Sequence, residues 1–364
     1  MIFLKKLVAL VTAVLLLITG CSAGAKTSSK YSKYTYEFLG AFDTMIQFMG
    51  YAENEKQFED MSRKGQTRFE ELHKLYDIYN TYEGINNVKT INDNAGIKPV
   101  EVKQELIDVI LFSKDWYKKT GSKINIALGP VLSIWHDYRE KGKENPAEAK
   151  LPDLEILKRA ALKTDLDKVA IDTAKRTVFL SEAGMRLDLG AVAKGYATEL
   201  VAKELMKAGY TSFIINSGGN VRVVGAPRDG TRSKWGIGIQ DPNTSTGIHS
   251  DTNLETVFMT DASLVTSGDY QRYYEVNGQR IHHIIDPVTL MPPYYYRSVT
   301  IMTKDSGVAD FIDTAAFILP YEQSRALIES IEGIDALWVM PDGSIRVTDN
   351  MKKMLKNLGG ASSK

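Results

Sequence analysis

The stretch Leu187-Asp-Leu-Gly-Ala-Val-Ala-Lys-Gly-Tyr196 is the part of the sequence around which the rest is organised. Apolar residues alternate with polar ones from Met185 to Leu189, which is typical of a strand. Gly190 follows, and a helical pattern of apolar residues then continues as far as Gly209. The pattern therefore predicts a strand that leads through a glycine turn into a helix.

Such a junction attracts anions, because the first N–H groups of a helix lack partners and its dipole is positive there. Asp188, Ala191 and Lys194 are spaced three apart through the turn. A carboxylate, a backbone carbonyl and a cationic side chain could therefore meet at one ligand. A plain strand–turn–helix with a capping Asp and a surface Lys explains the same residues.

The N-terminus has the pattern of a bacterial lipoprotein signal peptide. Lys5 and Lys6 precede an apolar run over residues 7–20, which is shorter than the roughly 20 residues that a membrane-spanning helix needs. Ile18-Thr-Gly-Cys21 then resembles a lipobox. We expect residues 1–20 to be a signal peptide, Cys21 to be lipidated, residues 21–34 to be a flexible tether and residues 35–358 to form a domain at the extracytoplasmic face of the cell membrane. A chance cysteine behind an ordinary secretory signal is the alternative.

Composition excludes several classes of protein. Cys21 is the only cysteine, which rules out a disulfide framework and a cysteine-based metal site or nucleophile. Lys and Arg total 45, as do Asp and Glu, so the net charge is zero and no basic field suggests binding to nucleic acid. The chain beyond the tether is long enough for a large core.

Strand and helix patterns are mixed along the chain without the regular alternation of βαβ units. Hairpin patterns occupy residues 34–51, 211–224, 270–285 and 336–347. Helical patterns occupy residues 54–75, 102–119 and 306–319. Polar or charged loops are expected at residues 76–84, 89–96 and 141–152. We therefore expect an α+β fold with mixed or antiparallel sheets and packed helices.

Ala309-Asp-Phe-Ile-Asp-Thr314 places oxygen-bearing side chains on one face of an otherwise apolar helix. Carboxylates on such a helix are costly to bury without a cation or hydrogen-bond partners. Hard oxygen ligands suit Mg²⁺, which also relies on substrate phosphates. Alternatively, Asp310 complements the helix dipole and Thr314 bonds back to its own helix.

Arg280-Ile-His-His-Ile-Ile-Asp-Pro287 is a second candidate. Adjacent side chains of a strand face opposite ways, so only one of His282 and His283 can face a site and the other is expected to be packed. The site-facing His would be a general base or a hydrogen-bond donor. Two His are too few for a zinc site. Asp286 leaves the strand at a turn, where it would fix a ligand or the backbone.

Two glycine-containing segments, Ser217-Gly-Gly-Asn220 and Thr266-Ser-Gly-Asp269, would allow backbone to approach a ligand closely, although such turns are commonly only structural. The sequence has no Walker-type loop, no Gly-x-Gly-x-x-Gly after a strand and no Gly-x-Ser-x-Gly elbow. Common nucleotide-binding and hydrolase motifs are therefore excluded.

Together and in this order, these motifs resemble the ApbE family, the FAD:protein FMN transferases, from about Phe42 to Val339. The resemblance implies an ApbE-like, T-fold-like flavin transferase fold. It implies a Mg²⁺-dependent enzyme that takes FAD as substrate, transfers FMN through a phosphoester to a Ser or Thr hydroxyl of an extracytoplasmic partner flavoprotein, and releases AMP. The partner would serve an electron-transfer chain.

The resemblance also implies roles for individual residues. The metal would be held by the carbonyl of Ala191 and by Asp310 and Thr314, with Asp313 on the same face. Asp310, Lys194 and His283 would be catalytic, Lys194 offsetting phosphate charge and His283 helping to deprotonate the incoming hydroxyl. The residues implied to contact or line the FAD site are Phe42, Thr44, Tyr79, Ala127, Leu128, Gly129, Asp188, Lys194, Thr266, Ser267, Gly268, His283, Ile284 and Asp286.

The chain departs from the family pattern at Leu290, where Asp-Pro-x-Thr is usually followed by Gly. We expect a differently shaped loop at the mouth of the site, which affects partner choice more than chemistry. Three alternatives to FMN transfer remain. They are an FAD pyrophosphatase that gives free FMN and AMP, a lipoprotein that binds FAD without turning it over, and a surface lipoprotein whose Asp, His and Lys residues are structural.

Overall fold

The structure, a computed structural model, describes residues 30–243 and 253–364. Tyr31–Lys364 form one compact unit. The expected signal peptide, Cys21 and most of the expected tether lie outside the described residues. In the described part of the chain no helix combines the length and the apolar character needed to cross a membrane. The lipid anchor and the boundaries of the domain therefore stay predictions.

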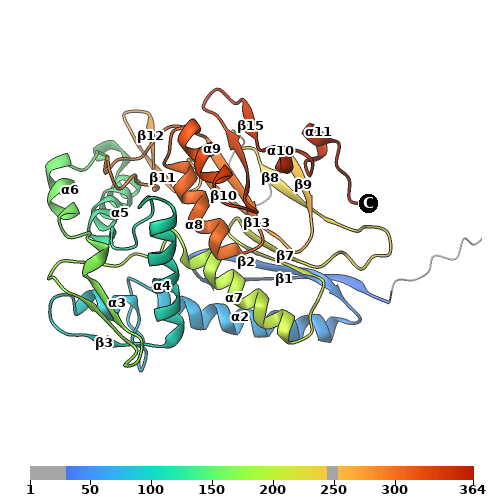
Figure 1. Ribbon diagram of the computed structural model, residues 1–364, viewed down its shortest axis with the longest axis horizontal. Coiled ribbons are helices and arrows are strands. Elements are labelled where there is room, and N and C mark those ends of the chain that lie inside the picture. Colours follow the sequence, from blue (N-terminus) through green and yellow to red (C-terminus); the bar gives the residue numbers. More distant parts are fainter. Residues whose placement is uncertain (1–29, 244–252) are drawn as a thin grey trace, which may run out of the picture. The chain divides into compact units, whose positions relative to one another are not determined.

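An eight-stranded antiparallel sheet forms the centre of the unit (Figure 1), in the order β1-β2-β6-β7-β10-β13-β14-β15. Its strands are β1 (Ser32–Ala41), β2 (Thr44–Ala52), β6 (Phe213–Ser217), β7 (Asn220–Val224), β10 (Ser263–Gly268), β13 (Ser298–Thr303), β14 (Asp335–Val339) and β15 (Ile345–Val347). Three of the four predicted hairpins supply neighbouring pairs of this sheet. The expected α+β class with antiparallel sheets is confirmed.

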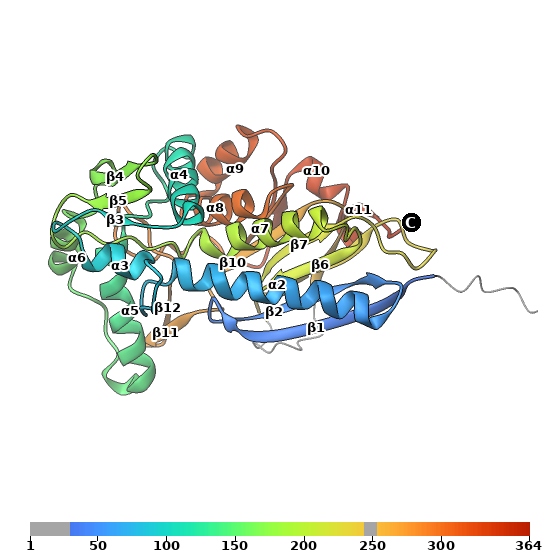
Figure 2. The same cartoon turned by 90° about the horizontal axis from the view of Figure 1, so that it is seen from below.

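Three helices cover one face of the sheet, and Figure 2 shows α2 lying along β1 and β2 with α7 beside it. They are α2 (Glu55–Tyr76), α7 (Ala193–Lys207) and α8 (Ser306–Phe317). The hairpin of β8 (Trp235–Gln240) and β9 (Asn253–Met259) covers the other face. Ile215 packs in the helix-side core and Ile214 in the hairpin-side core. Because both faces are buried, such strands read as continuous apolar runs.

Two smaller sheets and several further helices complete the unit. A three-stranded sheet joins β3 (Val100–Glu101), β5 (Thr177–Leu180) and β4 (Val169–Asp172). The hairpin of β11 (Tyr273–Val276) and β12 (Gln279–His282) packs on α5 through Trp135 and Tyr274. The remaining helices are α3 (Val88–Asp93), α4 (Gln104–Lys119), α5 (Gly129–Glu144), η1 (Pro146–Glu148), α6 (Leu154–Ala161), η2 (Leu166–Lys168), α9 (Tyr321–Glu329), α10 (Asp349–Lys352) and α11 (Lys356–Gly359).

Two of the predicted loops were wrong in part. Residues 89–96 were expected to be a loop, yet most of them belong to α3. Asn87 starts that helix with a capping box, in which its side chain accepts from the N–H of Thr90 while Thr90 bonds back to the N–H of Asn87. Residues 141–152 were also expected to be a loop, but α5 continues as far as Glu144 and a 3₁₀ turn follows.

The strand predicted at residues 185–189 is also wrong. Met185, Leu187 and Leu189 are buried, as the alternation predicted, but among the described residues this segment makes only an isolated bridge, between Arg186 and Leu128. The N–H and carbonyl of Leu187 bond instead to the side-chain amide of Asn92, at 2.7 and 2.9 Å. An Asn side chain, together with one backbone bond from the N–H of Asp188 to the carbonyl of Ile126, therefore takes the place of a partner strand.

Candidate functional site

The first turn of α7 packs directly against α8 because residue 195 is glycine. A Cβ atom built on Gly195 would lie 2.3 Å from the carbonyl oxygen of Ser306 and 2.4 Å from the Cβ of Asp310, closer than any side chain tolerates. The close approach lets the N–H of Gly195 donate a 2.8 Å hydrogen bond to Oδ2 of Asp310. Asp310 is thereby fixed to the backbone of the helix that follows the Leu187–Tyr196 stretch.

The N–H of Gly195 is among the first N–H groups of α7, which have no acceptor within their own helix, and Asp310 supplies one. The helical hydrogen bonds begin at the N-cap, Val192, whose carbonyl accepts from the N–H of Tyr196 at 3.0 Å. The carbonyl of Ala191 precedes the N-cap and so takes no part in them. This is the carbonyl that the family resemblance assigns to the metal.

Two more donors reach the other oxygen of Asp310. Lys194 Nζ lies 3.5 Å from Oδ1, and Asn220 Nδ2 donates to the same oxygen at 3.4 Å. Asn220 comes from the start of β7, so three predicted motifs meet at one carboxylate that is only 5% exposed. The sequence expectation that Lys194 and Asp310 act at one point is consistent with this geometry.

Asp313 lies one helical turn further along α8 and is fully buried. Its carboxylate oxygens make no hydrogen bond of good geometry within the part of the chain that the structure describes, but Ser267 lies near enough for its hydroxyl and N–H to lower the pKa of Asp313. Burial outweighs Ser267 and raises this pKa well above its ordinary value, the charge of Asp310 raises it further, and Lys194 lowers it. A buried carboxyl group with so few donors is costly unless a proton or a cation occupies it.

The donor set fits a hard divalent cation. Asp310, Asp313, the carbonyl of Ala191 and the hydroxyl of Thr314 offer oxygen ligands, which Mg²⁺ prefers. Thr314 Oγ1 donates to the carbonyl of Asp310 at 3.3 Å, as the structural alternative predicted, but its lone pairs stay available. Within residues 30–243 and 253–364 no three His, Cys, Asp or Glu side chains gather for a metal, so backbone and phosphate oxygens would have to complete the coordination.

The other structural alternative for Asp310 is wrong. It held that Asp310 complements the dipole at the start of its helix. The residue at that place is Asp305, the N-cap of α8, whose Oδ1 accepts from the N–H groups of Gly307 and Val308 at 2.9 and 3.2 Å. Asp310 lies beyond the first turn and faces α7 instead.

His282 and His283 divide as the strand geometry predicted. His282 is buried, with Nε2 2.6 Å from the carbonyl of Pro293 and Nδ1 accepting from the N–H of Ile284 at 3.3 Å. Both ring nitrogens are thus used within the fold, which makes His282 a packed, structural residue.

His283 follows the end of β12 and is the less buried of the two. Its Nδ1 lies 3.2 Å from the carbonyl oxygen of Arg272, which can only accept, so Nδ1 carries the proton and Nε2 keeps its lone pair. Burial lowers the pKa of His283 well below its usual value, and the charges of Arg272, Arg139 and Lys194 lower it further. The ring is therefore neutral at pH 7 and able to accept a proton at Nε2.

A second group of predicted residues gathers where residues 126–129 run beside residues 186–188. The N–H of Asp188 donates to the carbonyl of Ile126 at 2.8 Å, and Gly129 lies so close to Arg186 that a Cβ there would be 2.4 Å from its carbonyl oxygen. Burial raises the pKa of Asp188, while the N–H of Gly190 lowers it. The pKa of Tyr79 is raised mainly by burial and further by the charge of Asp188. Because that charge acts on Tyr79, the two residues lie near each other and Tyr79 belongs to this group.

Arg139 and His136 of α5 join the site without having been predicted. The ring of His136 lies 5.1 Å from that of Tyr79, and the Arg139 guanidinium donates to His136 at 2.8 Å. The charge of Arg139 also lowers the pKa of both His283 and Asp188. No sequence pattern marks these residues, because only tertiary packing brings α5 here.

The turn between β1 and β2 supplies Phe42 and Thr44. Phe42 has φ +56°, and its N–H donates to Nδ1 of His73 at 3.3 Å. Thr44 lies against the turn that leads to Asn220, since a Cβ on Gly218 would be 2.1 Å from Thr44 Oγ1. The structure thus places Thr44 beside the group around Asp310.

The remaining predicted residues have mainly packing roles. Thr266 Oγ1 bonds to Thr300 Oγ1 at 2.9 Å, Gly268 makes room for the ring of Tyr270, and Ile284 is buried in the core. Ala127 and Leu128 are likewise buried. Their backbone, rather than their side chains, is what the site can use.

Asp286 holds the turn that follows it. Its carboxylate accepts from the N–H of Val288 at 2.9 Å and from the hydroxyl of Thr289 at 3.0 Å. Leu290 ends this turn with φ +62°, the left-handed region that favours glycine. Its side chain is buried and its carbonyl accepts from Trp135 Nε1 at 3.0 Å. The loop thus keeps a glycine-type turn without a glycine.

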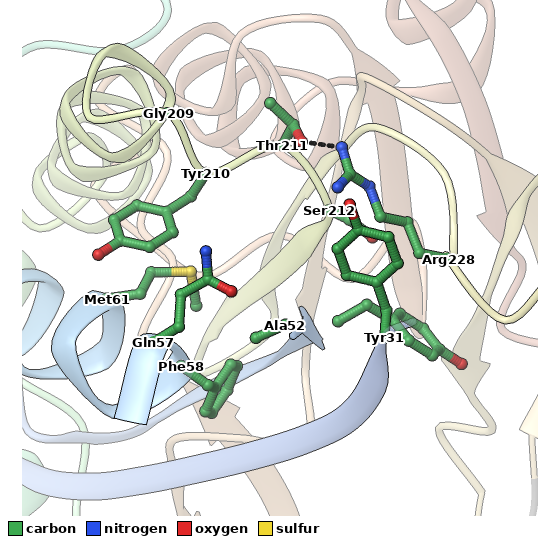
Figure 3. A pocket seen from close by; sticks show the side chains of 11 residues that line it. Tyr31, Ala52, Gln57, Phe58, Met61, Gly209, Tyr210, Thr211, Ser212 and Arg228 are labelled. Carbon is green, nitrogen blue, oxygen red and sulfur yellow. Dashed lines mark hydrogen bonds between the residues drawn. The ribbon is translucent and has the colours of Figure 1, made fainter. Parts of the chain in front are cut away.

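Two hollows lie outside the group around Asp310. The smaller, with an empty volume of about 350 Å³, lies among β2, the start of α2 and the segment after α7 (Figure 3). Arg228 donates to Thr211 there and stacks over the ring of Tyr31. A more open hollow is lined by Pro130 and Arg186, next to the second group of predicted residues.

Comparison with known proteins agrees with this geometry. The sequence matches the model of the ApbE family over residues 42–338. It is 35% identical over 270 residues to an FAD:protein FMN transferase of Treponema pallidum, covering 71% of this chain and 72% of the relative. It is 32% identical over 278 residues to an FAD:protein FMN transferase of Klebsiella pneumoniae, covering 76% and 82%.

Solved structures share the fold. The crystal structure of the ApbE protein of Thermotoga maritima superposes with a TM-score of 0.77 at 25% identity, covering 89% of this chain and 99% of that one. The flavin transferase ApbE of Vibrio cholerae superposes with a TM-score of 0.70 at 20% identity, with the same coverage, which shows likeness of fold alone.

Proposed function

Because this chain belongs to the ApbE family, we propose that it transfers FMN from FAD to a Ser or Thr hydroxyl of a partner protein. The observation that carries the proposal is the hydrogen bond from the N–H of Gly195 to Asp310. It fixes Asp310 beside Lys194, one helical turn from the buried carboxylate of Asp313. This arrangement suits the binding of a cation and a phosphate together.

In the proposed site, Mg²⁺ would be held by Ala191 O, Asp310, Asp313 and Thr314, and when bound it would supply neutralising charge to the pyrophosphate of FAD. Lys194 adds a second cationic group, since its Nζ lies beside Asp310. Transfer needs mainly positioning and neutralisation of oxygen charge, which these groups provide. The second group of predicted residues, around Tyr79 and Asp188, would hold the remainder of FAD.

The proposed reaction is one phosphoryl-type displacement. The hydroxyl oxygen of the acceptor forms a bond to the phosphorus on the FMN side, and the bond from that phosphorus to the bridging oxygen breaks. AMP leaves with the bridging oxygen, and the hydroxyl proton passes to Nε2 of His283. That nitrogen is suited to the task because the bond of Nδ1 to Arg272 fixes the tautomer.

We further propose that the reaction takes place at the extracytoplasmic face of the membrane, on a flavoprotein of an electron-transfer chain. The support is the lipobox-like sequence that ends at Cys21. One lipid-modified residue would anchor the domain without a spanning helix.

Mass spectrometry of an acceptor domain tests the function. The domain carries a target Ser or Thr and is incubated with this protein, FAD and Mg²⁺. One FMN phosphoester should be gained, and EDTA should prevent the gain. Free FMN and AMP without an adduct on any acceptor would instead show a pyrophosphatase, in which water replaces the hydroxyl. If FAD stays intact throughout, the protein binds FAD at most and does not cleave it.

A further inference from the structure

Asn220, at the start of β7, contacts the second oxygen of Asp310. Gly195 N donates to Oδ2 of Asp310 at 2.8 Å, and Asn220 Nδ2 donates to Oδ1 at 3.4 Å. Lys194 Nζ of α7 lies 3.5 Å from the same Oδ1. Asn220 is 1% exposed, so solvent does not compete for its bond. Donors from α7 and β7 therefore meet on the two oxygens of Asp310 and orient its carboxylate.

The backbone of Asn220 is held rigidly. It pairs with Ser217 of β6 on one side and with Val265 of β10 on the other. The intervening turn consists of Gly218 and Gly219, at φ +60° and +96°, which suits a two-residue hairpin. The side-chain amide therefore starts from a fixed position.

The same turn is tied to the start of α7. Ser217 Oγ lies 2.5 Å from Thr198 Oγ1, and Thr198 donates to the carbonyl of Lys194 at 2.7 Å. Because the hydroxyl proton of Thr198 is used in the bond to Lys194, Ser217 is the donor in the bond between the two hydroxyl groups. The β6–β7 turn and the first turn of α7 are thus joined independently of Asp310, and both then bind it.

A purely structural role explains Asn220 poorly. Its Oδ1 atom is buried and lacks a partner in the part of the chain that the structure describes. A buried, unsatisfied acceptor is destabilising, whereas an apolar residue of the same shape would avoid this cost. Retaining an amide here makes physical sense if its donor is needed to orient Asp310.

We infer that Asn220 is a positioning residue for the metal site. It does not touch the cation, but it holds the Asp310 carboxylate in the orientation that binds the cation. The inference rests on the proposed function, because it presupposes a divalent cation at Asp310. Partners that orient metal ligands in this way commonly affect metal affinity by about 10–100-fold when they are removed.

A titration with Mn²⁺ tests the inference. The domain over residues 31–364 is titrated in the presence of FAD, and the EPR signal of the free ion measures how much Mn²⁺ stays unbound. Asn220→Ala and Asn220→Leu both remove the donor, and the Leu variant keeps the side-chain volume and also removes the unsatisfied oxygen. Both should raise the Kd for Mn²⁺ about 10–100-fold. Excess Mn²⁺ should restore turnover, and the KM for FAD measured at saturating Mn²⁺ should stay at its native value.

Asn216→Ala is the matched control. Asn216 lies in the same hairpin, but its side chain accepts from the N–H of Gly219 at 3.1 Å. This variant should bind Mn²⁺ with the native Kd, whatever it does to the melting temperature. Equal weakening in the Asn216 and Asn220 variants would show that hairpin stability alone is responsible and would overturn the inference.

The outcomes separate the inference from the function on which it rests. Native affinity in a folded Asn220→Leu variant, shown by an unchanged melting temperature, would overturn the inference while leaving the metal site intact. An absence of saturable Mn²⁺ binding by the native protein would overturn the proposed metal site itself, and the inference with it.

Discussion

The N–H of Gly195 donates to Oδ2 of Asp310, 115 positions later in the sequence, over 2.8 Å. This bond caps the first turn of α7 and orients a carboxylate of α8. The carbonyl of Ala191, which precedes the N-cap of α7, lies outside the helical hydrogen bonds. Both groups are oxygen ligands of the kind that the proposed Mg²⁺ site requires.

Gly195→Ala should damage the site and the fold together. In an exposed helix this change would stabilise by about 1 kcal/mol. Here the new Cβ would overlap Ser306 and Asp310, so we expect a net loss of about 1–3 kcal/mol in the free energy of unfolding. Urea denaturation measures it. Lys207→Ala, at the exposed end of the same helix, is the control and should change stability by less than about 0.5 kcal/mol.

Asp310→Asn should abolish transfer while preserving the fold. The amide keeps the shape of the side chain but removes the negative charge that the cation needs. We expect at least about a 100-fold fall in kcat, comparable to the loss of a major electrostatic contact. Acceptor labelling at saturating Mg²⁺ is the measurement. Native labelling by this variant would contradict the metal assignment, and treatment of the native protein with EDTA should reproduce the defect.

His283→Gln and His282→Gln should separate chemistry from packing. His283→Gln removes the proposed base and should lower kcat by about 10²–10⁴-fold, with an unchanged melting temperature. His282→Gln disturbs a buried ring that bonds at both nitrogens, so it should lower the melting temperature and largely spare kcat. The reverse pattern would show that the two residues have been assigned the wrong roles.

The lowered pKa of His283 also predicts a pH profile. An ordinary His becomes protonated below about pH 6.5 and would then lose its function as a base. Because burial and nearby cations hold the pKa of His283 well below that value, Nε2 stays unprotonated there. The kcat for transfer should therefore not fall on this account between about pH 7.5 and pH 6.5. A fall centred near pH 6.5 that disappears in His283→Gln would contradict this.

Asp313→Asn should stabilise the metal-free protein at high pH. Burial raises the pKa of Asp313, so the folded state binds this proton more tightly than the unfolded chain does. That contribution to stability is present below the unfolded pKa of about 4 and is lost as the pH rises through the folded pKa. In EDTA at about pH 8 the variant should therefore melt above the native protein, by about 2–4 °C for each kcal/mol gained.

Added Mg²⁺ supplies the control for Asp313→Asn. The cation should raise the melting temperature of the native protein and have a smaller effect on the variant, which lacks one charged ligand. If the variant melts below the native protein in EDTA at about pH 8, the carboxylate is already satisfied without a cation and the assignment of Asp313 fails.

Leu290 offers a test in which glycine should be better tolerated than alanine. Removing this buried side chain costs about 2–5 kcal/mol in either variant. Leu290→Ala keeps the penalty of about 1–2 kcal/mol for a side chain at φ +62°, whereas Leu290→Gly relieves it. We expect Leu290→Gly to melt above Leu290→Ala. The opposite order would show that the turn relaxes away from this conformation.

The sequence by itself determined the local elements whose periodicity is strong. Helix α2 and the hairpins at residues 34–51 and 211–224 could be predicted because apolar spacing acts locally, as do the turn glycines of the second hairpin. The split between His282 and His283 followed from strand geometry alone. The family could also be named, since five separate motifs had to occur in one order.

Only the tertiary structure decided how those motifs meet. The segment at residues 185–189 alternates like a strand, yet it is satisfied by the side chain of Asn92, a partner 95 positions away that no local pattern announces. The same holds for Arg139 and His136, which join the site because α5 packs against the β11–β12 hairpin.

The metal-binding arrangement depends most strongly on tertiary contacts. Sequence spacing places Asp310, Asp313 and Thr314 on one helical face, but it does not say which carboxylate is bonded and which is free. Close packing at Gly195 gives Asp310 a backbone donor, whereas the carboxylate of Asp313 makes no hydrogen bond of good geometry among the described residues. Hydrogen bonds and burial act between residues that only the fold brings together, whereas periodicity acts between neighbours in the sequence.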